Sequence, residues 1–147
     1  MKKLLNVTSH SPAVDTAVLI ARVGIGALML THGIPKMAML FSGGPVQFPP
    51  VLGLSAGLSL GLAVFAEVIC SILLLVGFAT RLAVIPLIIT MLIAALLIHA
   101  ANPIAMKEPA LHYLLVYVML LLTGSGKYSM DYLLQNKAMG SVQAVVG

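Results

Sequence analysis

Residues 55–101 read SAGLSLGLAVFAEVICSILLLVGFATRLAVIPLIITMLIAALLIHAA, and this stretch decides the fold. Apart from the histidine near its end, Glu67 and Arg81 are its only ionisable acidic or basic side chains. A helix needs about 20 mostly apolar residues to cross a bilayer, and two segments of that length lie here, residues 55–78 and 81–101. Only Ala79 and Thr80 separate them, so we expect a tight antiparallel hairpin of two membrane-spanning helices.

Two more apolar segments flank this hairpin, at residues 14–37 and 110–124. All four are rich in Leu, Ala and Met and show no sustained alternation of apolar and polar residues, which excludes strands. The sequence therefore predicts an all-α fold, an integral membrane four-helix antiparallel bundle with both termini on the same side. We expect residues 1–137 to form one transmembrane domain and residues 138–147 a flexible tail.

The composition supports a lipid environment. Hydrophobic residues make up 61% of the chain and charged residues 8%, whereas soluble domains carry about 25% charged residues. The net charge of +4 comes from basic residues scattered singly, so we expect no nucleic-acid partner. The expected partners are the lipid bilayer and either another membrane protein or further copies of the chain. The single cysteine, Cys70, excludes a pair of thiols within one chain.

The basic residues also predict the orientation. With four crossings, the termini and the hairpin at Arg81 share one side, which carries most of the positive charge: Lys2, Lys3, Arg81, Lys127 and Lys137, against Lys36 and Lys107 on the other side. Positive charge favours the cytoplasmic side. We therefore expect a multi-pass protein of the bacterial inner membrane with cytoplasmic termini.

Ionisable groups inside a membrane helix cost about 2.5–3.5 kcal/mol each on insertion scales, so they should face the bundle interior and find partners. Arg22 lies about 12 Å from the start of the first predicted helix, and Glu67 about 16 Å from the same side of the membrane, at about 1.5 Å per residue. This similarity in depth predicts an Arg22–Glu67 ion pair. The alternative is that the Arg22 side chain extends to the membrane interface and that a protonated Glu67 donates to a backbone carbonyl.

A second polar level lies near the opposite side. His32 and His99 fall at the same predicted height, His112 opens the fourth helix there, and Lys36 projects from the same face as His32. Tyr113 and Tyr117, four residues apart, would form one wall of a pocket. Three interpretations are compatible with these imidazoles: side chains hydrated at the membrane interface, a site for a quinone or another small molecule, and a metal or haem site. We predict no metal site, because no carboxylate completes one.

Several short motifs resemble the DoxX family of small membrane proteins. They comprise Ala21-Arg22-Val23-Gly24, His32-Gly33 with Lys36, Glu67, Gly77-Phe78-Ala79-Thr80-Arg81, His99, and the run from Gly124 to Asp131, GSGKYSMD. The resemblance implies a four-helix bundle in the bacterial inner membrane, and relatives include the membrane subunit of a thiosulfate:quinone oxidoreductase. The family often has a glutamate where His112 stands here, and Glu108 lies one turn earlier.

The resemblance implies a subunit or accessory factor of a quinone- or thiol-linked membrane redox system, with quinone as the expected ligand class. In that interpretation Glu67, His32 and His99 handle protons as catalytic groups. The residues expected to bind the cofactor are Arg22, His32, Lys36, Glu67, His99, His112, Tyr113 and Tyr117. Whether the chain is itself an enzyme stays open, since it has no catalytic motif of its own. A non-catalytic scaffold of a membrane complex and a pathway for small solutes or protons are the alternatives.

Overall fold

The computed structural model describes residues 11–137, and over this range the chain is helical and contains no strand. Helix α2 runs from Pro12 to Phe41 and is followed by a long connection, residues 42–55. The second span is built from α3 (Ala56–Val64), the π-helical segment η1 (Phe65–Cys70) and α4 (Ser71–Val76). The third is α5 (Thr80–Ile93) with the π-helical η2 (Ala94–Ile98), and the fourth is α6 (Ile104–Thr123).

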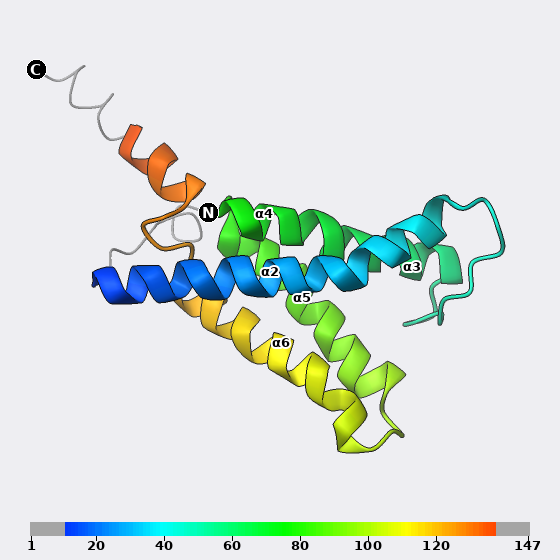
Figure 1. Ribbon diagram of the computed structural model, residues 1–147. Helices are drawn as coiled ribbons and strands as arrows, with labels where there is room; N and C mark the ends of the chain where they lie inside the picture. The colour runs from blue at the N-terminus through cyan, green and yellow to red at the C-terminus, as the bar shows by residue number, and fades with distance from the viewer. Residues whose placement is uncertain (1–10, 138–147) are drawn as a thin grey trace, which may run out of the picture.

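Four spans within the described residues are long and apolar enough to cross a membrane: Pro12–Phe41, Ala56–Val76, Thr80–Ile98 and Ile104–Thr123. They run alternately up and down, so the start of α2, the α4–α5 turn and the end of α6 lie at one end of the bundle (Figure 1). We call this the Arg22 end. The opposite end, which carries residues 42–55 and 99–103, is called the loop end. The predicted all-α membrane bundle is confirmed.

Two helices are longer than expected. The first begins at Pro12 and ends at Phe41 although Pro35 lies inside it. The fourth begins at Ile104, six residues before its predicted start, because Pro103 precedes the helix and Pro109 is accommodated close to its beginning. Pro103 costs α6 no hydrogen bond, because the N–H groups at a helix start have no partner within the helix, whereas Pro109 is the sixth residue and removes one bond near the start of α6.

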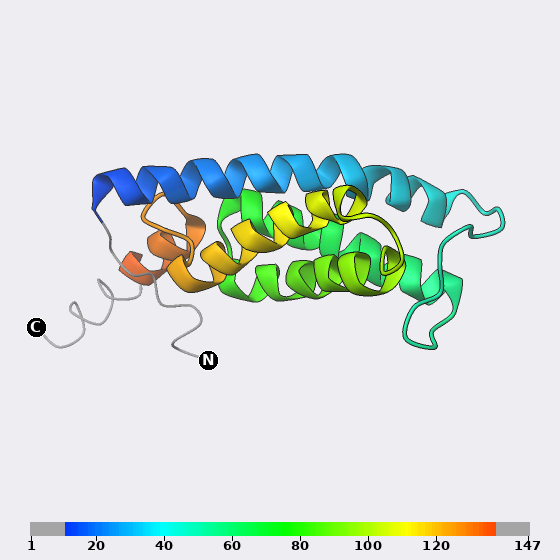
Figure 2. The same cartoon turned by 90° about the horizontal axis from the view of Figure 1, so that it is seen from below.

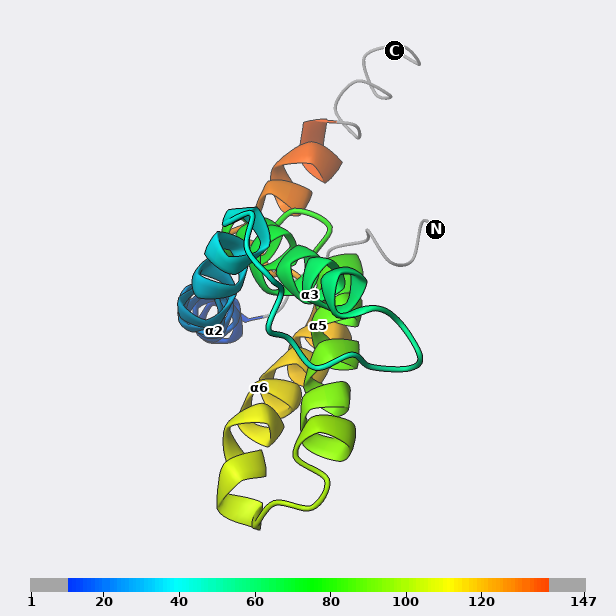
Figure 3. The same ribbon diagram turned by 90° about the vertical axis from the view of Figure 1, so that its right-hand side faces the viewer.

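The helices do not pack evenly. Helix α5 and helix α6 lie side by side along their length, and both lean away from α2 and α3 towards the loop end (Figures 1 and 3). Seen from below, all four spans remain roughly parallel (Figure 2). The main apolar core lies between the spans and includes buried Met29, Leu74, Leu87 and Leu120. The splay leaves two cavities near the loop end, which are described below.

Large apolar side chains cover the outside of the bundle. Ile20, Leu28, Phe65, Ile89 and Leu122 are all exposed. In water such a surface would aggregate, because contiguous apolar patches on soluble monomers are small. This surface is suited to acyl chains, and the chain is a multi-pass membrane protein.

The predicted tail, residues 138–147, and two of the orientation residues, Lys2 and Lys3, lie outside the described part of the chain.

Candidate functional site

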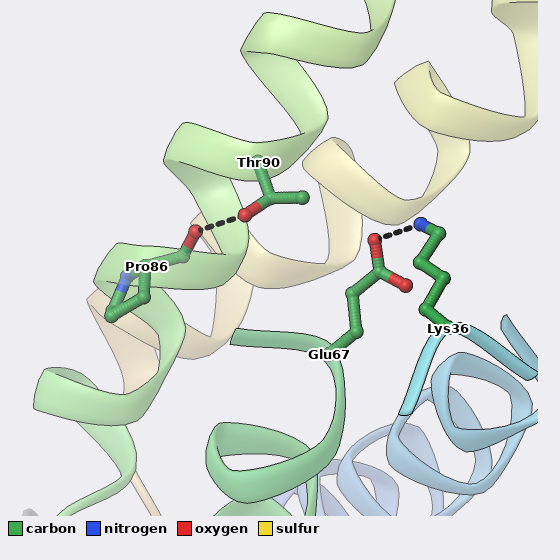
Figure 4. A network of polar contacts seen from close by, with 4 residues as sticks. All are labelled: Lys36, Glu67, Pro86 and Thr90. Atoms are coloured by element: carbon green, nitrogen blue, oxygen red, sulfur yellow. Dashed lines mark hydrogen bonds and ion pairs between the residues drawn. The ribbon is translucent and has the colours of Figure 1, made fainter. Parts of the chain in front are cut away.

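The centre of the site is an ion pair between Lys36 of α2 and Glu67 of η1. The Lys36 Nζ donates to the Glu67 Oε1, and the two side chains point towards one another across the gap between their helices (Figure 4). The side chain of Glu67 is 2% exposed and that of Lys36 is 30% exposed. The second carboxylate oxygen, Oε2, is buried and has no hydrogen-bond partner within residues 11–137. A buried acceptor of this kind is normally satisfied by a donor.

A polar cavity of about 250 Å³ lies beside this pair. Side chains from all four spans line it, and five of them are polar or ionisable: His32, Lys36, Glu67, His99 and Tyr113. Three methionines, Met29, Met91 and Met106, form much of the apolar remainder. Acid–base groups separated in sequence are thus gathered into one space inside a membrane protein, where such groups usually mark a functional site.

Local backbone geometry brings Glu67 and His99 to this level. Glu67 lies within the π-helical η1, and His99 directly follows the π-helical η2. Such segments insert an extra residue into a helical turn and often occur at functional sites. Across from η1, Gly33 allows α2 to approach closely: a Cβ at this position would lie 2.9 Å from the Glu67 carbonyl carbon. The close contact sets Lys36, one turn further along α2, beside Glu67.

The aromatic and imidazole groups form a connected wall. The rings of His32 and Tyr113 meet edge to face with centroids 5.8 Å apart, and Tyr113 lies 6.0 Å from the ring of Tyr117. Tyr117 is completely buried, and its hydroxyl has no hydrogen-bond partner among the described residues. The Nδ1 of His99 accepts from Asn102 Nδ2 at 2.9 Å. This bond leaves the ring proton of a neutral His99 on Nε2, as a donor.

A second cavity of about 360 Å³ shares Lys36, Glu67 and Ala94 with the first. Its other lining residues are almost all apolar and come from α3, η1, α5, η2 and the 42–55 connection. The polar cavity and the apolar cavity therefore meet at the Lys36–Glu67 pair.

The predicted Arg22–Glu67 pair is wrong. Arg22 is level with Gly77, because a Cβ on Gly77 would overlap the Arg22 guanidinium. Glu67 is level with Gly33, eleven residues further along α2. The prediction measured the depth of Arg22 from the start of α2 and the depth of Glu67 from the α4–α5 turn, as if both lay at the same height. In the structure α2 begins at Pro12, ten residues before Arg22, which is the residue level with that turn. The two groups are therefore separated by about 15 Å along the bundle.

Arg22 belongs instead to a buried polar cluster that closes the Arg22 end. Its Nη2 donates to the carbonyl oxygen of Tyr128 at 2.6 Å, and the side chain is 1% exposed. The Asp131 carboxylate acts on it electrostatically and also accepts from the backbone N–H groups of Ala79 and Thr80. In this arrangement Arg22 holds the C-terminal segment against the bundle and does not line the polar cavity.

The remaining predicted residues fall into two groups. His32, Lys36, Glu67, His99 and Tyr113 line the polar cavity, and Tyr117 contacts it through Tyr113. His112 is exposed and does not line the cavity, because it precedes Tyr113 by one residue and projects from a different face of α6. Glu108, the expected substitute for the family glutamate, is likewise exposed. Within residues 11–137 no three His, Cys, Asp or Glu side chains are arranged to hold a metal ion.

Sequence reasoning missed Asn102, which fixes the His99 tautomer, and Lys36 as the partner of Glu67. The signal for Lys36 was present in Gly33, since small residues mark close helix contacts in membranes. Matching Gly33 to Glu67 would have placed Lys36 beside the carboxylate. No comparable signal marked the two π-helical segments.

A family model described as DoxX matches residues 17–100, which include most of the first span, all of the second and third, and the ion pair. No curated protein matches the chain. No solved structure matches it either.

Proposed function

The chain belongs to the DoxX family, and from this premise we propose that it is the quinone-binding subunit of a membrane redox system in the bacterial inner membrane. The observation that carries the proposal is the polar cavity beside Lys36 and Glu67. It brings together a buried carboxylate oxygen without a partner among the described residues, a cation and an imidazole donor. A quinone ring has matching groups at its opposite edges, carbonyl oxygens when oxidised and hydroxyls when reduced.

The side chains have distinct roles in this proposal. Glu67 Oε2 accepts a proton from a ring hydroxyl, and Lys36 offsets the negative charge of the carboxylate. His99, held by Asn102, donates through Nε2 to the opposite oxygen. His32 and Tyr113 bound the ring with their edge-to-face pair. A quinone supplies two-electron, two-proton chemistry when bound, and the two electrons that leave the reduced ring must pass to a partner protein or that protein's cofactor.

The first test is binding of a quinone that lacks an isoprenoid tail. We expect the purified protein to bind it, and Glu67→Gln to weaken binding about 10–100-fold, because a hydrogen bond to a charged group contributes about 1.5–3 kcal/mol. Isothermal titration calorimetry in detergent gives the dissociation constants. Mass spectrometry of solvent extracts gives the quinone that co-purifies.

Glu108→Gln is the matched control, because it removes an exposed carboxylate outside the cavity. Equal affinities for the native protein and Glu67→Gln would contradict the proposed site. Absence of any quinone binding, together with a constant protein partner after crosslinking in native membranes, would establish the scaffold alternative instead. Proton or solute flux into liposomes above that of empty vesicles would favour the pathway alternative.

We propose cytoplasmic termini on the basis of charge. The described loop end carries Lys36, which is paired with Glu67, and Lys107, whereas the Arg22 end carries Arg81, Lys127 and Lys137. In a Cys70→Ser background, Ser42→Cys should react with a membrane-impermeant maleimide on intact spheroplasts. Asn136→Cys, at the Arg22 end, should react only after lysis. The reverse labelling pattern would invert the topology.

A further inference from the structure

We propose that the apolar cavity holds the hydrocarbon chain of a membrane amphiphile, the polyisoprenoid tail of a quinone, which enters directly from the lipid between the second and third spans. The inference rests on the proposed function for its head group. It adds the ligand's second half, its route of entry and the residues that select for a long tail.

The walls of this cavity offer no free polar group apart from the ion pair. Two hydroxyl groups line it, those of Ser59 and Thr90. Ser59 Oγ accepts from the Val51 N–H at 3.2 Å, and Thr90 Oγ1 donates to the Pro86 carbonyl at 2.9 Å (Figure 4). Both hydroxyls are thus engaged within the protein. The remaining lining is apolar and suited to a hydrocarbon chain. The cavity volume of about 360 Å³ falls within the range of about 300–1,000 Å³ typical of small-molecule sites.

The mouth of the cavity faces the bilayer. Leu62 and Phe65, on the second span, are 52% and 50% exposed, and Ile89 of the third span is 51% exposed. All three line the cavity and belong to membrane-spanning helices. Their exposed surfaces therefore contact acyl chains, so a lipid-soluble molecule reaches the cavity without crossing water.

The 42–55 connection covers the loop end of the cavity. Phe48, Val51, Leu52 and Leu54 line it from this side. The connection is held down by the Val51–Ser59 bond and by packing of Phe48 against the small core around Leu60. Phe48 also lies under the Lys36 ammonium, 5.9 Å from ring centroid to Nζ. This apolar cover separates the tail cavity from the aqueous side.

Lys36 and Glu67, which line both cavities, determine which class of amphiphile binds. A ligand whose chain fills the apolar cavity presents its head at Lys36 and Glu67, where the unpartnered Oε2 requires a donor. A phospholipid phosphate offers no donor to that carboxylate oxygen, and the Lys36 ammonium that could attract it is already paired with Glu67. A reduced quinone ring supplies a hydroxyl donor. The geometry therefore favours a quinone over a bilayer phospholipid.

The test compares two quinones with the same ring, one without a tail and one with several isoprenoid units, in lipid nanodiscs. For the native protein we expect the tail to increase affinity at least tenfold. Ala63→Phe places a ring in the apolar cavity; it should abolish this tail-dependent gain and change tail-less binding by less than twofold. Ala27→Phe, on the exposed face of α2, is the matched control and should retain the gain.

Ile89→Trp blocks the mouth from its exposed edge and provides the same test if Ala63→Phe does not fold. A tail-dependent gain that survives in the folded blocking variant would overturn the inference, as would equal affinities of both quinones for the native protein. Co-purification of a phospholipid that Ala63→Phe removes, with no tail effect, would assign the cavity to lipid. Failure of both quinones to bind the native protein would instead contradict the proposed function.

Discussion

Asp131→Ala is expected to destabilise the protein by about 1.5–3 kcal/mol or more, because it leaves two backbone N–H groups of the α4–α5 turn without their charged acceptor. Asp131 is 9% exposed, and its carboxylate accepts two backbone hydrogen bonds. Its Oδ1 accepts from the Ala79 N–H at 2.7 Å, and its Oδ2 accepts from the Thr80 N–H at 3.3 Å. Its negative charge also acts electrostatically on buried Arg22.

These contacts explain why one residue near the end of the described chain matters to a turn 51 residues earlier. The α4–α5 turn contains Ala79 at φ +48°, a left-handed conformation that costs energy for a residue with a side chain. Thr80 begins α5, so its N–H is one of the unpaired donors at a helix N-terminus, where a carboxylate is favourable. Asp131 serves as the cap of α5 from a distant part of the sequence, and its own N–H donates to the Gly77 carbonyl at 3.0 Å.

The free energy of unfolding, followed by circular dichroism during titration with SDS, measures the effect. Asn136→Ala is the matched control, since it alters an exposed polar residue of the same C-terminal helical segment and should change stability by less than about 0.5 kcal/mol. Replacing Arg22 with methionine in the Asp131→Ala background should cost less than the sum of the single changes, because it removes the uncompensated cation. Additive costs would show that the two groups are not energetically coupled.

The fold was predictable because its determinants are local. Length and apolarity identify four spans, and the two residues between Phe78 and Arg81 require an antiparallel hairpin. A further local determinant lies near the C-terminus, where Ser129 accepts from the Tyr132 N–H at 3.2 Å as the cap of the helical residues 130–137. Helix length, the short hairpin and the Ser129 cap depend only on residues close in sequence, so tertiary packing does not change them.

The site was predictable only in part, because partners across helices depend on axial register. An error of about three helical turns in the axial register of α2 paired Arg22 with Glu67. The assignment of the helices themselves was unaffected. The rotation of α6 was also beyond the sequence: His112 and Tyr113 are adjacent, yet only Tyr113 lines the cavity. The two π-helical segments shift the phase of the residues that follow them, which a regular 3.6-residue period does not anticipate.

Gly33→Leu is expected to separate α2 from the second span and to remove quinone binding. A Cβ at Gly33 would lie 2.8 Å from Val68 Cγ2 and 2.9 Å from both the carbonyl carbon and oxygen of Glu67. Two of these three neighbours are backbone atoms of the segment that positions the carboxylate, so they cannot rotate away as a side chain would. The larger side chain must push the helices apart, and overpacking of this kind costs about 1–3 kcal/mol or more.

The consequence for the site follows from the position of Lys36, one helical turn beyond Gly33. Moving α2 away from η1 lengthens the Lys36–Glu67 contact and leaves the buried Glu67 carboxylate without its cation. We expect the loss in binding free energy for the proposed quinone head to exceed the loss in free energy of unfolding. Gly33→Ala should show a smaller loss in the same direction, because the methyl group meets the same backbone but gains about 1 kcal/mol in helix propensity.

Gly24→Ala is the matched control: nothing lies within 4 Å of its added Cβ, so the variant should be as stable as the native protein or more so, with unchanged quinone binding. If Gly33→Leu matched Gly24→Ala in SDS titration and calorimetry, close approach of α2 to η1 would not be what holds Lys36 against Glu67.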